Sequence, residues 1–173
     1  MDATLEQQFL HHSAEKLKQY TERIATSVGK LNEEQIWMRG GDNENAIGNL
    51  ILHLCGNVRQ WIVSGVGGQP DHRKRDEEFD ARGGVPAAEL IGRLRKTVDE
   101  ATAVILAVSS ERLSDRLVIQ QYPVCVMEAI YHVVEHFSMH TGQILFITKM
   151  LSGADLGFYA HLRTTAAHGQ KTP

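Results

Sequence analysis

The chain has 173 residues, of which 42% are hydrophobic and 23% are charged, and its net charge is −3. This length and composition predict one ordinary globular core and exclude a second domain of ordinary size. The weakly negative net charge predicts neither nucleic acid nor membrane as a partner, and the apolar runs are too short to span a membrane. Two cysteines without a CxxC motif are typical of the reducing cytoplasm.

The first predicted element is a long helix over residues 4–31, because apolar side chains recur there at steps of three and four. Asn32 and Gln35 have the spacing of a capping box, which predicts one short helical turn. The glycines at 40 and 41 then predict a loop.

A second long helix is predicted over residues 45–63. Beside its apolar stripe, Asn49, His53 and Asn57 form a second line at steps of four residues. A buried polar group without a partner costs about 1–3 kcal/mol, so this line must be satisfied. His53 is therefore either a hydrogen-bonded core residue or a metal ligand with polar neighbours. Cys55 points away from it and is expected to be a small buried side chain rather than a ligand.

Residues 64–86 are rich in glycine, proline and mixed charges, which predicts a solvated crossover. A third helix over 86–108 begins at Pro86, and a connector with a short extended segment at 117–122 follows. The fourth long helix covers 128–151. Together these elements predict an all-α fold, a four-helix bundle with long crossover connections, in one domain over 1–162, with a flexible tail at 163–173.

The fourth helix carries His132, His136 and His140, each four residues from the next. Four residues advance a helix by ~6 Å and ~40°, so the three rings share one side, and an i, i+4 pair can hold one metal ion. No glutamate stands in the HExxH place, which excludes the metalloprotease interpretation. His132 and His140 are ~12 Å apart along the axis and cannot share an ion. The pair is therefore either His132 with His136 or His136 with His140.

Metal ligands in helical bundles project inward from facing helices. His53 on the second helix and a histidine pair on the fourth would give three neutral nitrogens, with further coordination positions open to water or substrate. The expected ion is divalent, with zinc first and nickel, iron or manganese as alternatives.

Two segments resemble the DinB-like (YfiT-like) metalloenzyme superfamily: GNLILHLCGNVRQW from Gly48 and EHFSMHTGQ from Glu135. The resemblance covers about residues 9–151. It implies a four-helix bundle, often a homodimer, with a metal held by His53, His136 and His140. His132 would then be a pocket residue. Several relatives are thiol-dependent transferases or isomerases, which implies a low-molecular-weight thiol as cofactor.

We therefore expect a metal-dependent enzyme, a thiol-dependent transferase or else a hydrolase, that acts on a small molecule. No residue is assigned as the catalytic base. Glu135 is expected at the surface because it points ~100° away from His136. The alternatives are a non-catalytic stress-response module that binds a metal or small molecule, and a plain helical bundle with incidental histidines. Candidates to line the pocket or support the ligands are Asn49, Asn57, His132 and Gln143.

Overall fold

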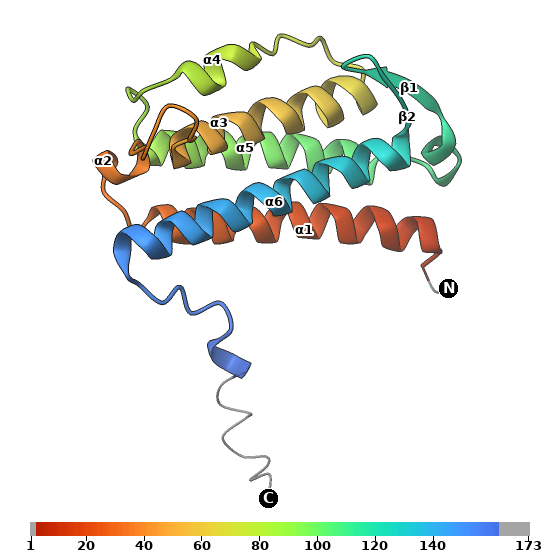
Figure 1. Cartoon of the computed structure of the whole chain (residues 1–173). Coiled ribbons are helices and arrows are strands. Elements are labelled where there is room, and N and C mark those ends of the chain that lie inside the picture. The colour runs from red at the N-terminus through yellow and green to blue at the C-terminus, as the bar shows by residue number, and fades with distance from the viewer. Residues whose placement is uncertain (1–2, 163–173) are drawn as a thin grey trace, which may run out of the picture.

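Four long helices make up most of residues 3–162, the part of the chain that the computed structural model describes (Figure 1). They are α1 (Leu5–Val28), α3 (Ile47–Val58), α5 (Ala87–Leu106) and α6 (Val126–Ser152). The π-helix η1 (Arg59–Val66) continues α3 without a break. The prediction of a mostly helical chain is confirmed, and each long helix ends within a few residues of its predicted bounds. The predicted tail, 163–173, lies outside the described residues.

The helix ends follow from local sequence signals. Thr4 caps α1 through a capping box with Gln7, and Cys125 begins α6 in the same way with Glu128. At the other end of α6, Gly153 adopts φ 64°, a left-handed conformation that favours glycine. The predicted capping box also opens the short helix α2 (Glu33–Ile36).

The four long helices pack in a square around one apolar core. Both α1 and α3 contact α5 and α6, so α1 lies diagonally opposite α3. Fully buried side chains come from all four helices, among them Leu17, Leu54, Leu94 and Phe137. Burying a side chain of this size contributes about 1.5–3 kcal/mol, so the facing stripes supply the main stabilising term. No helix of the described residues is long and apolar enough to cross a membrane.

The connections between the long helices are themselves ordered. Helix α4 (Arg75–Asp80) packs along α3 and lies over its outer side (Figure 1). A 3₁₀ turn, η2 (Ser110–Ser114), precedes a hairpin of β1 (Arg116–Ile119) and β2 (Tyr122–Cys125). The extended segment expected at 117–122 is therefore part of an antiparallel pair. Its two turn residues, Gln120 and Gln121, both have positive φ, as in a type I′ turn.

One expectation about the connections holds for most of the segment but is wrong at Arg73 and Glu78. Residues 64–86 were expected to be a solvated crossover, yet Glu78 is buried and the side chain of Arg73 is only 4% exposed. The crossover folds inward because Asn49, at the start of α3, donates to the carbonyl oxygens of Glu78 and Ala81, both at 2.9 Å. The charged segment thus becomes one wall of the histidine site.

Candidate metal centre

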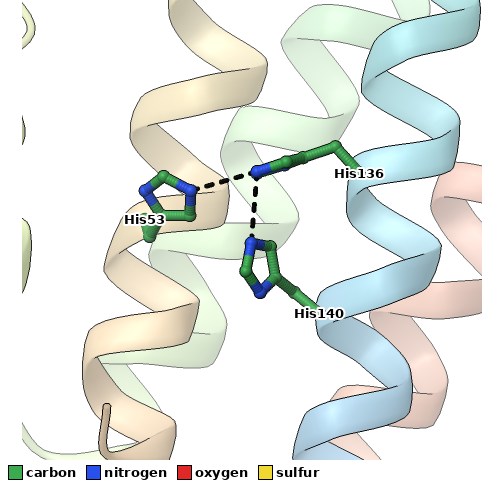
Figure 2. Close-up of side chains that lie close together, drawn as sticks. All are labelled: His53, His136 and His140. Atoms are coloured by element: carbon green, nitrogen blue, oxygen red, sulfur yellow. Dashed lines mark hydrogen bonds between the residues drawn. The ribbon is translucent and has the colours of Figure 1, made fainter. Parts of the chain in front are cut away.

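Three imidazoles from two helices converge on one point (Figure 2). The Nε2 atom of His136 lies 3.1 Å from Nε2 of His53 and 3.1 Å from Nε2 of His140. His53 comes from α3, and the other two come from consecutive turns of α6. One nitrogen of each ring lies within 4.8 Å of the others. The structure thus brings together the three histidines that the sequence analysis selected.

The outer nitrogens of two of these rings have acceptors of their own. Nδ1 of His53 lies 3.0 Å from Oε2 of Glu78, and Nδ1 of His140 lies 2.6 Å from Oε1 of Gln143. A carboxylate oxygen and an amide oxygen only accept hydrogen bonds, so we assign an Nδ1–H donor to each ring. Arg73 also approaches Nδ1 of His53, at 3.1 Å, but the same nitrogen of Arg73 donates to Glu78 at 2.8 Å.

This assignment makes the arrangement suited to a cation. With Nδ1 protonated on His53 and His140, the Nε2 atoms of both rings carry lone pairs that point at Nε2 of His136. His136 has at most one proton at Nε2, so it cannot donate to both neighbours with good geometry. A divalent metal ion would satisfy all three lone pairs. Hydrogen bonds from Nδ1, the ring nitrogen that faces away from the metal, to a carboxylate or an amide are the usual way to fix metal-binding histidines in the required tautomer.

Glu78 is held in its charged form behind His53. Burial raises the pKa of its carboxyl group, but hydrogen bonds from Arg73 and His53 outweigh this and leave the pKa below its ordinary value. Arg73 donates to both carboxylate oxygens, from Nε and Nη2, each at 2.8 Å. Its third nitrogen donates to Gln60 at 2.9 Å. The bidentate pair therefore fixes the carboxylate that orients His53.

The histidines of α6 are held in their neutral form. Burial, followed by the neighbouring rings of His140 and His53, lowers the pKa of His136 to about 3. Burial also lowers the pKa of His140, although the hydrogen bond to Gln143 opposes the shift, and burial lowers the pKa of His132. Metal ions bind the neutral imidazole, so these rings are ready to act as ligands at neutral pH.

The lowered pKa values predict that acid destabilises the metal-free protein. Below its ordinary pKa of 6.5, His136 takes up a proton in the unfolded chain but stays neutral in the folded chain until about pH 3. The free energy of unfolding should therefore fall between those limits, while above them this group has no effect. Urea unfolding of metal-free protein at about pH 7.5 and about pH 5.5 measures the fall. In His136→Leu the fall should be smaller, and an equal fall would contradict the prediction.

Gly56 provides the space that Glu78 occupies. A Cβ at this position would overlap Oε1 of Glu78 and come within 2.9 Å of Nε of Arg73. We predict that Gly56→Ala displaces the carboxylate from His53 and lowers metal affinity by about 10–100-fold, as is usual when the partner of a metal-binding histidine is lost. Metal titration of the folded variant measures this change.

Gly92 offers a matched control because it lies in α5, and a Cβ added there would meet no atom within 4 Å. Gly92→Ala should leave metal affinity unchanged and stabilise the helix by up to about 1 kcal/mol. Wild-type metal affinity in Gly56→Ala would show that the contact between Glu78 and His53 is dispensable.

A cavity of about 480 Å³ opens beside His53 and His136. Asn57 and His132, two of the predicted pocket residues, line it together with His53 and His136. His132 packs against Trp61, with ring centroids 4.1 Å apart and ring planes tilted by 39°, and takes no part in the three-nitrogen group. The remaining lining residues come from η1, the crossover and the hairpin: Trp61, Arg73, Arg75, Gln120, Tyr122, Pro123 and Val124.

Two other candidates have positions outside this cavity. Asn49 is fully buried and joins the crossover to α3, where it holds the backbone of Glu78 behind His53. Gln143 is exposed and supports His140 from its outer side. Glu135 is exposed, as expected. Cys55 is half-buried, and burial raises the pKa of its thiol to about 12, which fits an inert packing role.

Comparisons with known proteins give a fold and a family. The fold is similar to that of a crystal structure described as the conserved protein of locus from Enterococcus faecalis, with a TM-score of 0.68 and 16% sequence identity. The match covers 83% of this chain and 97% of that chain, and at this identity it shows a shared fold alone. No curated protein matches the chain. The model of DUF1572, a family of proteins of unknown function, matches residues 4–162, and the chain therefore belongs to the DUF1572 family.

Proposed function

We propose that His53, His136 and His140 bind one divalent metal ion and that the chain is a metal-dependent enzyme of the transferase type. The observation that carries this proposal is the convergence of three Nε2 atoms. At the same time Nδ1 of His53 contacts Glu78, and Nδ1 of His140 contacts Gln143. Without a cation, the lone pairs of His53 and His140 compete for at most one proton at Nε2 of His136, whereas three Nε2 ligands suit a divalent ion well.

An open coordination sphere favours chemistry over a purely structural role. Structural zinc sites are closed by four protein ligands, whereas catalytic sites keep three ligands and an open position. Among the described residues, only these three histidines group together as metal ligands. A bound metal would supply Lewis-acid chemistry and lower the pKa of a water or thiol at the open position. In this proposal Glu78 and Gln143 hold the ligand rings, and the adjoining cavity receives the substrate.

The finer assignment follows the resemblance to the DinB-like superfamily. We propose that the square of α1, α3, α5 and α6 is the DinB-like four-helix bundle, that zinc is the first candidate metal, and that a low-molecular-weight thiol is the cosubstrate. We also propose a cytoplasmic homodimer. The exposed apolar side chains of Tyr131, Met139, Phe146 and Met150 on α6 support self-association, which sedimentation analysis of the full chain would measure.

One observation favours the alternative, a module that binds a metal or small molecule without turnover. No aspartate or glutamate lines the cavity within the described part of the chain, and Glu78, beside His53, is engaged by Arg73. The cavity thus lacks an obvious carboxylate that could act as general base. A non-catalytic role in stress response would need only the metal and the pocket.

Turnover separates the two functions. Untagged protein loaded with zinc or nickel would be assayed with cellular thiols and a panel of electrophiles, with His53→Ala as the metal-free control. The enzyme proposal expects thiol consumption that requires both metal and His53. Stoichiometric metal binding without turnover across the panel would favour the module, and absence of metal binding would contradict both.

A further inference from the structure

Two rows of side chains face one another beyond the three ligands. The row on α3 and η1 is His53, Asn57 and Trp61, and the row on α6 is His140, His136 and His132. The proposed metal centre lies at the end of the two rows that contains His53. At the other end, Trp61 packs against His132, and both line the cavity. The π-helix η1 begins between Asn57 and Trp61, and such widened turns are frequent at functional sites.

Two polar groups in this part of the cavity wall lack partners. Oδ1 of Asn57 and Nε1 of Trp61 are buried and form no hydrogen bond, and each residue is only 4% exposed. An unsatisfied buried polar group costs about 1–3 kcal/mol and calls for an explanation in any folded protein. Both residues line the cavity, so a bound molecule that reaches these two atoms would satisfy them. It would accept from the indole N–H and donate to the amide oxygen.

Two arginines line the same cavity. Arg73 and Arg75 line it, and no acidic side chain of the described residues does so, although the chain as a whole has a net charge of −3. Arg73 is engaged by Glu78 and Gln60. Arg75 lies over the ring of Phe79, 4.8 Å from its centroid, and no described residue forms an ion pair with it. Its guanidinium is therefore available to an anion.

We propose that this cavity binds a small organic anion with a flat apolar body. Its carboxylate or phosphate group binds Arg75, its polar substituents satisfy Trp61 and Asn57, and its body packs against the ring of Tyr122 at the hairpin. The position beside His53 and His136 makes this anion the substrate class of the proposed enzyme. That role, though not the binding itself, rests on the proposed function.

The two tryptophans allow a direct test by NMR of ¹⁵N-labelled full-length protein. The indole N–H of Trp37 already donates to the carbonyl oxygen of Val85 at 3.2 Å and serves as an internal control, whereas that of Trp61 is unpaired. Titration with benzoate or phenyl phosphate, up to about 10 mM, should place an aromatic ring beside Trp61, move the Trp61 signal and leave the Trp37 signal in place. Benzamide, the neutral analogue, should bind at least about tenfold more weakly. The variant Trp37→Phe assigns the two signals.

Matched variants test the role of the charge. Arg75→Gln should weaken anion binding at least about tenfold. Lys74→Gln removes the same charge from the neighbouring residue, which is exposed, pairs with Glu77 and does not line the cavity, so binding should stay within about twofold. The proposal is overturned if neither anion moves the Trp61 signal, if benzamide binds as well as benzoate, or if both variants weaken binding equally.

Separate measurements keep this inference distinct from the proposed metal centre. Each titration would be run on metal-free protein and on zinc-loaded protein whose metal content has been measured. Zinc binding without any anion effect at Trp61 overturns the substrate class and leaves the metal centre standing. An anion effect that depends on Arg75, in a protein that binds no zinc, supports the anion site and contradicts the metal centre.

Discussion

Replacing His136 with alanine is expected to lower the bound divalent metal from about one equivalent to background. His136 is the ligand whose Nε2 atom lies 3.1 Å from the Nε2 atoms of both other histidines, so its removal leaves two nitrogens on different helices. Two imidazoles bind zinc far more weakly than three in a fixed arrangement. Metal analysis of untagged, dialysed protein measures the loss.

His132→Ala is the matched control because it removes an imidazole of the same helix one turn away. His132 lies against Trp61 and outside the three-nitrogen group, so this variant should keep most of its metal. Circular dichroism of both variants would show that the helices remain folded. Equal loss of metal in the two variants would show that the assumed set of ligands is wrong.

Glu78→Gln is expected to produce the largest combined loss of stability and metal affinity. The substitution leaves the guanidinium of Arg73, whose side chain is 4% exposed, without a buried counter-charge. Breaking such a pair costs about 3–5 kcal/mol. It also weakens the acceptor at Nδ1 of His53, which should lower metal affinity by about 10–100-fold. Urea unfolding of metal-free protein and metal titration of folded protein measure the two effects separately.

Glu77→Gln is the control for this prediction because Glu77 is adjacent, exposed and, among residues 3–162, paired only with Lys74. A surface pair of this kind contributes about 0–1 kcal/mol, and it has no contact with the histidines. Should Glu78→Gln lose stability but bind metal as well as wild type does, Glu78 would be a structural residue that does not orient His53.

The long helices and a histidine pair on α6 could be predicted because both depend on local spacing, whereas the set His53, His136 and His140 came from the resemblance to the DinB-like superfamily. Apolar steps of three and four residues mark the buried stripes, and the four-residue step from His136 to His140 places both rings on one side of α6. The spacing of the histidines alone also allowed His132 to be the ligand in place of His140. The structure brings His140 rather than His132 into the three-nitrogen group.

The support behind the ligands could not be predicted because it comes from contacts between distant segments. Arg73 and Glu78 lie in a run of mixed charges, a composition typical of solvated loops. Only the tertiary fold shows that Asn49 draws this run inward and that Gly56 leaves room for the carboxylate. A glycine in the middle of a helix facing the crossover is the one local signal of this close approach.

X-ray absorption spectroscopy of the zinc-loaded protein would test the proposed centre most directly, because it reports the atoms bound to the metal. We predict three imidazole nitrogens at about 2.0–2.1 Å, with oxygen at the remaining positions. A sulfur ligand at about 2.3 Å, or fewer than three imidazoles, would contradict a centre built from His53, His136 and His140.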